Sequence, residues 1–417
     1  MNLLNDIKKV IKQKPIITLL IIAFFFVFFN LFLYDLHLQN YIFPDSNDYY
    51  LSAQFLYNDF RGHAYRPILF ALITGIPIFF TANKDIIFNW VILLNFICWL
   101  GSIVLLFKII SNFISLKFSF LLTIIFICSI SNLFFVFHYL TETILVFMLL
   151  AIIFYFQKFL YSKKYKFLIF SLAILLSSVL IKPMTTYLAV ICILIFIPFY
   201  LKNIKNKYNF LIYICLLLIS IQLVGMKAQF GNFTISYIDK VTIHNYLFSK
   251  SDCLEKGIEY QVVNNPRAEY LWKFTPIDQK KITENDMKFQ FYNNINNVFI
   301  AYLDNLFTNI FSGSLAVYIL ENKNNLYLFE TLKSFTFKIT KFYNIIFILT
   351  SLFFGLWYFF NFQKYWNIII IICTFFTFYV ILVSGISSNQ GDRFHIVVYP
   401  FILILTSFFI SKSKIYK

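Results

Sequence analysis

The sequence predicts an all-α, polytopic membrane protein, and three observations lead to this fold class. Of the 417 residues, 60% are hydrophobic and 22% are aromatic. Charged residues make up 13% of the chain, well below the quarter that is typical of soluble domains. The apolar residues lie in long runs separated by short Lys-containing tracts. A soluble core could not bury so much apolar surface, so the excess is expected to face lipid.

Ten apolar runs are long enough to cross a bilayer as helices. They cover approximately 15–34, 86–107, 118–137, 143–160, 167–181, 184–201, 208–226, 343–360, 366–384 and 394–410. The first run follows a Lys-rich segment and lacks a small-residue cleavage site, which indicates a retained signal anchor.

An eleventh run, 67–82, is shorter and contains Gly75 and Pro77. If it does not cross, the inner side carries one acid, Asp6, and 17 lysines. These are Lys8, Lys9, Lys12, Lys14, Lys108, Lys117, Lys158, Lys163, Lys164, Lys166, Lys202, Lys205, Lys207, Lys364, Lys412, Lys414 and Lys417. If 67–82 crossed, 13 of these 17 lysines, those from Lys108 onward, would move outside, which the positive-inside rule disfavours. Both termini are therefore expected in the cytoplasm, with 67–82 as an outer juxtamembrane or re-entrant segment.

This topology divides the chain into three parts. Residues 1–226 form a transmembrane module with spans one to seven and a first outer loop, 35–85. Residues 227–342 form a large outer region, and residues 343–417 form a second module with spans eight to ten. Within the outer region, apolar residues at helical spacing predict either an amphipathic helix on the outer leaflet or the core of a loop domain. They are Phe299, Leu303, Leu306, Phe307 and Ile310.

The net charge of +16 does not indicate a nucleic-acid partner, because most Lys residues lie between the apolar runs, as topology requires. Five of the six Cys residues lie within apolar runs, and the chain contains no CxxC pair. Neither a zinc site nor a disulfide framework is supported.

The candidate functional residues are the few charges expected at the outer membrane boundary. Glu142 is the only acidic residue between Asp85 and Asp239. An ionisable group at this depth is costly and therefore a functional candidate, although an interfacial carboxylate that reaches water is the alternative. Asp45 and Asp48 lie in a Pro-Asp-Ser-Asn-Asp run, where helix N-capping alone would also explain Asp45.

The positions of the arginines are a second indication of a functional site at the outer membrane boundary. The chain has four Arg residues, namely Arg61, Arg66, Arg267 and Arg393. The predicted topology places all of them outside, where the planar guanidinium suits phosphate or carboxylate. Lys182 returns to the same membrane level, and His63 lies in the first outer loop. A snorkelling interfacial side chain is the alternative interpretation of Arg393.

In this order the motifs resemble those of the GT-C superfamily of integral-membrane glycosyltransferases, and most closely the branch with protein O-mannosyltransferases and the lipid A aminoarabinose transferase. The resemblance extends over most of the chain. Its elements are Asp45 in PDSNDYY followed by Arg66-Pro67-Ile68-Leu69-Phe70, Glu142 in Thr141-Glu142-Thr143-Ile144-Leu145, Lys182-Pro183, and Arg393-Phe394 ahead of Tyr399-Pro400. The family usually has Arg-Pro-Pro-Leu-Tyr, so Ile68 departs from its pattern.

The resemblance implies transfer of a sugar from a polyprenyl-phosphate donor to an extracytoplasmic lipid, glycan or protein acceptor. Asp45 would be the general base for the acceptor hydroxyl. Glu142 would orient the acceptor or balance charge in an oxocarbenium-like transition state. Arg66, Lys182 or Arg393 would hold the leaving phosphate.

Asp48 and His63 are further candidates for substrate binding. Some members of the superfamily use a divalent metal and others do not. Asp45, Asp48 and Glu142 carry the oxygen ligands that such a metal prefers. We assign no cofactor, and whether the protein uses a divalent metal stays open.

Two other classes remain open. An O-antigen-type polymerase or ligase would depend chiefly on outer-loop Arg rather than on Asp45 and Glu142. A transporter or lipid flippase usually places polar residues at the bilayer midplane, whereas these spans are nearly free of charge between their ends. The composition is typical of an integral protein of a bacterial inner membrane. The lipid bilayer is therefore expected to contact most of the apolar surface.

Overall fold

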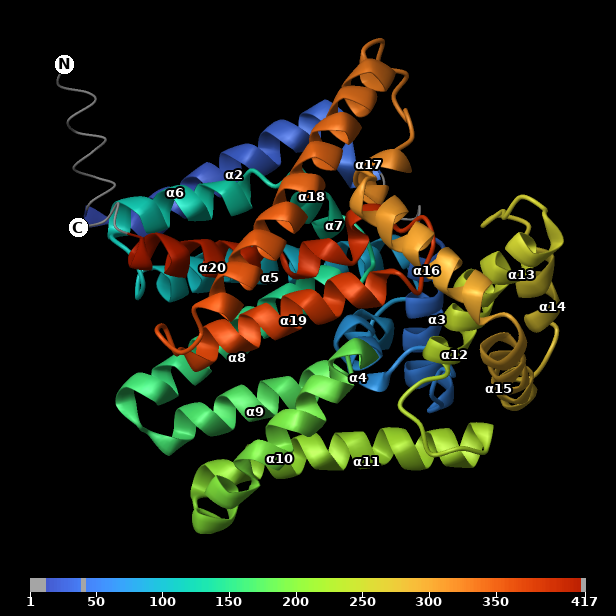
Figure 1. Ribbon diagram of the computed structural model, residues 1–417, viewed down its shortest axis with the longest axis horizontal. Helices are drawn as coiled ribbons and strands as arrows, with labels where there is room; N and C mark the ends of the chain where they lie inside the picture. Colours follow the sequence, from blue (N-terminus) through green and yellow to red (C-terminus); the bar gives the residue numbers. More distant parts are fainter. Residues whose placement is uncertain (1–12, 39–42, 414–417) are drawn as a thin grey trace.

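The computed structural model describes residues 13–38 and 43–413, and every regular element in these ranges is a helix (Figure 1). Six helices are long and apolar enough to cross a membrane, or up to eight if each of two bent pairs is one span. The six are α2 (Pro15–Tyr34), α5 (Lys84–Ile110), α8 (Glu142–Ser162), η3 with α10 (Pro183–Lys202), η4 with α11 (Lys207–Phe230) and α18 (Phe329–Phe360). The predicted all-α membrane class is confirmed.

The remaining predicted spans are bent or short. α6 (Leu116–Ile127) and α7 (Ile130–Val136) meet at 58°, and the 3-10 turns Gly391–Val397 meet α20 (Tyr399–Lys412) at 52°. α9 (Tyr165–Val179) and α19 (Ile368–Ser384) are apolar but have 15 and 17 residues. Each predicted run thus coincides with helix, while the count of ten spans stays a prediction.

The run at 67–82 is broken into two short helices, α4 (Ile68–Thr74) and η2 (Ile76–Phe79). A helix of seven residues, such as α4, rises about 10 Å, against a hydrocarbon core of about 30 Å. α4 is therefore too short to span. The break falls at Gly75, where a Cβ atom would lie 2.5 Å from the ring of Tyr57, so the close packing of α3 (Pro44–Asp59) requires glycine.

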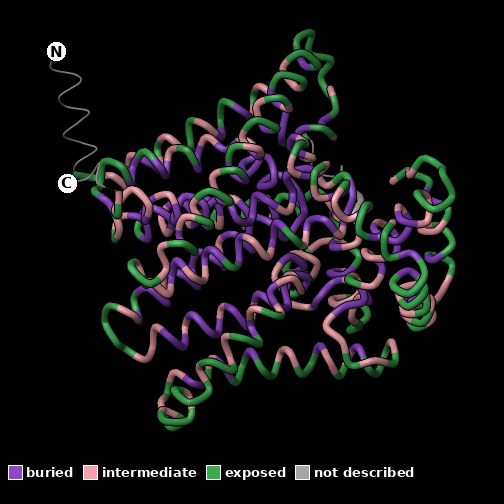
Figure 2. The backbone as a smooth tube through the Cα atoms, viewed as in Figure 1, coloured by how far each residue is buried: buried purple, intermediate pink, exposed green. Residues whose placement is uncertain are grey.

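α8 lies at the centre of the bundle. It packs against α5 and α9, and most of its residues are buried. α2 contacts α5 and α6, while α18 and α19 pack on α20. α10 (Thr186–Lys202) and α11 (Phe210–Phe230) lie at the edge and expose most of their side chains (Figure 2). Apolar side chains exposed on spanning helices are stable only in lipid.

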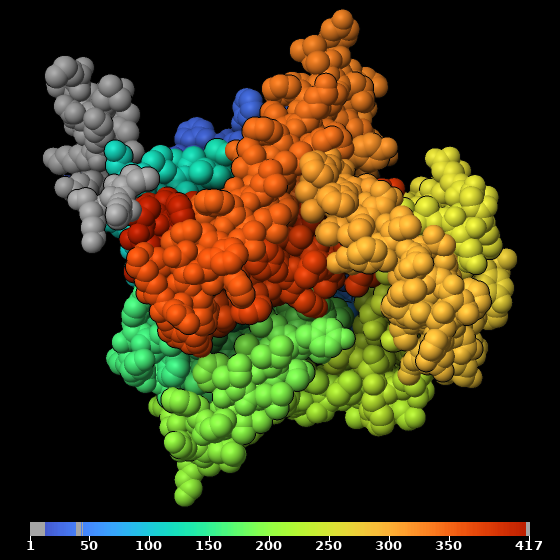
Figure 3. Space-filling model, in the orientation of Figure 1, coloured from blue at the N-terminus to red at the C-terminus, as the bar shows by residue number. Residues whose placement is uncertain are grey.

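The two ends of the bundle differ (Figure 1). The α8–α9, α10–α11 and α18–α19 connections and the end of α20 lie toward one end, and these segments carry predicted inner lysines such as Lys163, Lys205 and Lys364. α3, α4 and the helices between α11 and α18 lie toward the other end (Figure 1), where residues 238–310 project as a helical lobe (Figure 3). Which end faces the cytoplasm stays a prediction. Five predicted inner lysines lie outside the described residues, namely Lys8, Lys9, Lys12, Lys414 and Lys417.

The outer region predicted at 227–342 is largely helical. Its elements are α12 (Ile238–Thr242), the π-helix η5 (Ile243–Phe248), α13 (Ser249–Lys256), α14 (Pro266–Leu271), α15 (Pro276–Asn293), α16 (Ile295–Ile310) and α17 (Leu315–Tyr318). α18 begins at Phe329, within the predicted outer region. On α16, Phe299 and Phe307 are exposed, while Ala301 and Asn305 are buried against the protein. Two residues of the predicted apolar stripe, Phe299 and Phe307, therefore face outward, while Leu303, Leu306 and Ile310 are half-buried.

Candidate active site

Six of the seven predicted site residues form one connected set of ion pairs, which we call the ion network. In order of contact they are Asp48, Arg66, Asp45, Arg393, Glu142 and Lys182. They come from α3, from the connection before α4, from the first residue of α8, from the residue before η3 (Pro183–Thr185) and from η6 (Gly391–Arg393). The fold thus brings together charges that lie far apart in the sequence.

The ion network is continuous because Asp45 and Glu142 each accept from two basic side chains. Arg66 Nη2 lies 2.7 Å from Asp45 Oδ1 and 3.0 Å from Asp48 Oδ2. Arg393 Nη2 lies 2.7 Å from Asp45 Oδ2, and its Nε lies 2.7 Å from Glu142 Oε1. Lys182 Nζ reaches the same Glu142 oxygen at 3.0 Å. Equal numbers of acidic and basic groups leave the ion network without net charge.

The start of α3 positions its two aspartates. Pro44 opens the helix and Asp45 lies in the first turn, both favoured by helix N-terminal geometry and dipole. Asp45 and Asp48, three residues apart, share one helix face. The N-cap position is Phe43, with no side-chain capping bond, so the N-cap explanation of Asp45 is wrong. The carboxylate of Asp45 instead forms ion pairs with Arg66 and Arg393.

The loop that carries Arg393 is held by α16. Asn309 Nδ2 donates to Ser384 O at 2.8 Å and to Ser387 O at 2.7 Å, and its Oδ1 accepts from Gln390 N at 2.9 Å. Gly391 follows with a φ of +55°, where a Cβ would lie 2.4 Å from the carbonyl oxygen of Gly313. Only glycine fits there without a backbone shift.

Burial of the acids increases from one end of the ion network toward the other. The side chain of Asp48 is 41% exposed, that of Asp45 is 32% exposed and that of Glu142 is 0% exposed. Burial by itself would raise the pKa of Asp45, but the charges of Arg393 and Arg66 outweigh it and hold the pKa below its usual range. Asp45 is therefore accessible but weakly basic while both arginines hold it. Glu142, by contrast, is closed off from solvent and contacts Arg393 and Lys182.

His63 lies beside the ion network and does not join it. Its Nδ1 accepts from Tyr65 N at 3.2 Å, and its ring stacks on Phe55 with centroids 5.8 Å apart. Burial lowers the pKa of His63 to about 4, despite the opposing charge of Asp48. The imidazole is therefore neutral near pH 7, which suits hydrogen bonding rather than charge pairing.

Aromatic residues around the ion network were missed by the sequence reasoning. The guanidinium carbons of Arg66 and Arg393 lie 4.5 Å and 5.5 Å from the ring centroids of Tyr49 and Phe43, within cation–π range. Tyr246, from η5, is close enough to interact electrostatically with Asp45, Arg393 and Arg66. In a chain with 57 Phe and 28 Tyr residues, no spacing distinguishes these few from lipid-facing rings.

The candidate metal ligands do not converge as a metal centre. Within residues 13–38 and 43–413, no three His, Cys, Asp or Glu side chains come together in a group that could hold a metal ion. Basic side chains stand between Asp45, Asp48 and Glu142 in the ion network. We therefore derive no step through a metal.

No family model, curated protein or solved structure significantly matches this chain. The fold and the site define its class by themselves. It is a helical membrane protein that carries a balanced ion network where its apolar bundle meets a helical lobe.

Proposed function

We propose that this protein is a membrane glycosyltransferase of the GT-C type, which transfers a sugar from a polyprenyl-phosphate donor to an extracytoplasmic lipid, glycan or protein acceptor. The observation that carries the proposal is that Arg66 and Arg393 share the partly exposed carboxylate of Asp45. Paired guanidinium groups at the end of an apolar bundle suit a phosphate attached to a lipid tail. The bundle would accept the tail and the arginines the charge.

In the proposed reaction the donor phosphate competes with Asp45 for Arg66 and Arg393. The freed carboxylate then regains its basicity and takes the proton of the acceptor hydroxyl. The acceptor oxygen bonds to the anomeric carbon while the bond from that carbon to the phosphate oxygen breaks. The electron pair leaves with polyprenyl phosphate, and the arginines stabilise its added negative charge.

Glu142 is a positioning residue in this scheme. Because its side chain is fully buried and accepts from both Arg393 and Lys182, it fixes two cations without reaching a substrate. Charge balance, one of the two roles expected from the resemblance, fits this geometry. Direct contact with an acceptor does not fit it.

The polymerase or ligase alternative would depend on an outer-loop arginine, and Arg267 is the arginine of the predicted outer region 227–342. It lies on α14 and pairs with Asp286 at 2.6 Å and with Asp252 at 3.4 Å. Arg267 therefore has its own defined surroundings apart from the ion network. Its substitution separates the two enzyme classes.

The test is sugar transfer in membranes supplied with a panel of radiolabelled polyprenyl-phosphate sugars. Asp45→Asn is expected to abolish transfer while the protein still accumulates. Asp59→Asn is the matched control, because Asp59 lies on the same helix and its pair with Arg61 is at the surface. Full transfer by Asp45→Asn, combined with its loss in Arg267→Ala, would favour the polymerase or ligase class. Wild-type membranes that use no donor in the panel would contradict the proposal.

A further inference from the structure

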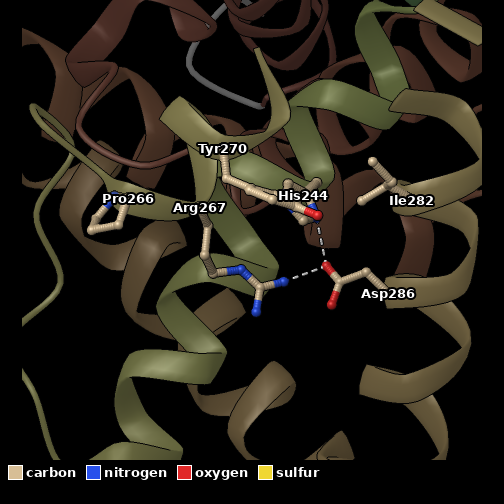
Figure 4. Close-up of a pocket in the computed structure, with 6 residues that line it drawn as sticks. All are labelled: His244, Pro266, Arg267, Tyr270, Ile282 and Asp286. Atoms are coloured by element: carbon tan, nitrogen blue, oxygen red, sulfur yellow. Dashed lines mark hydrogen bonds and ion pairs between the residues drawn. The ribbon is translucent and has the colours of Figure 1, made fainter. Parts of the chain in front are cut away.

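The helical lobe contains a cavity of about 360 Å³ that the ion network does not use (Figure 4). It is lined by His244, Pro266, Arg267, Tyr270, Ile282 and Asp286. These side chains come from η5, α14 and α15. The volume falls within the range of small-molecule sites, roughly 300–1,000 Å³.

The polar side of the cavity is centred on Asp286. His244 and Arg267 approach this carboxylate from two directions (Figure 4). His244 Nδ1 lies 2.7 Å from Asp286 Oδ2, and Arg267 Nη2 lies 2.6 Å from the same oxygen. Arg267 Nη1 also pairs with Asp252, which in turn binds Lys256. The charges around the cavity therefore compensate one another, and neither an anion nor a cation is favoured as ligand.

Two buried polar atoms have no partner within the described residues. Asp286 accepts from His244 Nδ1, and in the tautomer that carries its single proton on Nδ1 the other ring nitrogen, Nε2, is an acceptor. The His244 side chain is 5% exposed, and its Nε2 finds no hydrogen-bond donor in the described part of the chain. Arg267 Nε is likewise a buried donor without an acceptor there. One free acceptor and one free donor match hydroxyl groups, which both donate and accept.

We propose that this cavity binds a neutral saccharide unit. A sugar hydroxyl would donate to His244 Nε2, and a second sugar oxygen would accept from Arg267 Nε. The exposed ring of Tyr270 would cover the apolar C–H face of the sugar, with Ile282 as a further apolar wall. Such sites combine an apolar lining with a few converging polar groups. The proposal does not depend on the transfer reaction assigned to the ion network.

The test uses the full-length protein in nanodiscs and a panel of neutral methyl hexosides and N-acetylhexosaminides, with binding measured by saturation-transfer NMR and calorimetry. At least one neutral glycoside is expected to bind the wild-type protein. Tyr270→Ala, at an exposed position that does not support the core, is expected to weaken binding about tenfold. His244→Phe keeps a ring but removes both the Nε2 acceptor and the Nδ1 contact with Asp286, and it is expected to weaken binding similarly. Tyr292→Ala, at an exposed tyrosine of α15 outside the cavity, is the matched control and should bind normally.

Three results would overturn the proposal. One is the absence of binding by every neutral glycoside up to its solubility limit. Another is undiminished binding in Tyr270→Ala. The third is tighter binding of an anionic sugar, glucuronate, than of the neutral glycosides, since it would show that the cavity selects charge.

Discussion

Glu142→Gln should destabilise the protein because it removes a fully buried charge that neutralises two cations. The substitution keeps the shape of the side chain and one acceptor oxygen, but it leaves Arg393 and Lys182 without the carboxylate at 2.7 Å and 3.0 Å. Removing one partner of a buried ion pair costs about 3–5 kcal/mol. Burial lowers the pKa of Lys182, and the charge of Glu142 opposes this shift. Lys182 is therefore expected to deprotonate in the variant, which places the loss near the lower limit.

The assay is reversible unfolding in mixed micelles of mild detergent and SDS, followed by circular dichroism. Asp59→Asn, which removes a surface pair, should change the free energy of unfolding by about 1 kcal/mol or less. Adding Lys182→Met to Glu142→Gln should recover part of the loss, because the variant then no longer bears the cost of burying an unpaired Lys182 amine or of deprotonating it. A loss below about 1 kcal/mol for Glu142→Gln would refute the reasoning, since the carboxylate could not then be buried between two cations.

Three further predictions concern the surroundings of the ion network. Gly391→Ala should lower sugar transfer about tenfold or more by displacing Arg393, whereas the same variant with normal turnover would show that the tight loop is not needed. The pKa of His63 is lowered from 6.5 to about 4 in the folded protein, so the unfolded state binds a proton first as the pH falls. The contribution of neutral His63 to the stability of the fold is therefore complete above pH 6.5 and is lost toward pH 4. His63→Gln should therefore flatten the acid limb of SDS unfolding midpoints, and an unchanged limb would contradict this. A spin label at Phe307→Cys in a background without other cysteines should be accessible to oxygen and shielded from a nickel chelate, unlike one at Asp304→Cys; equal shielding would argue against lipid contact by the apolar stripe of α16.

The charged partners could be selected from the sequence because topology restricts where charge lies. Counting lysines placed Asp45, Glu142 and Arg393 at one membrane level, and the structure joins these three side chains directly. Their pairing could not be predicted, because it depends on how deeply each side chain is buried. His63 shows the difference, since it is close to Arg66 in the sequence but bonds to its own loop.

Helix breaks and polar packing were less predictable. α6 and α7 meet at 58° around Cys128 and Ser129 without proline or glycine, so composition does not reveal the bend. On α16 the apolar stripe was evident, but the asparagines on its other side were overlooked. Asn305 and Asn309, four residues apart, bind backbone carbonyls ahead of Arg393. Asparagines repeated at helical spacing opposite an apolar stripe therefore predict a helix face that binds the backbone of a neighbouring loop.

The absence of net charge in the ion network explains how one carboxylate can serve two purposes in the proposed reaction. With Arg66 and Arg393 bound, the pKa of Asp45 is lowered, so in the proposed reaction the site would not deprotonate a hydroxyl before a donor arrives. An incoming phosphate would add negative charge beside Asp45, and like charges raise a carboxyl pKa. Donor binding would therefore create the base that the next step needs. Taking the acceptor proton would then neutralise Asp45 as negative charge grows on the leaving phosphate, while buried Glu142 keeps Arg393 in place throughout.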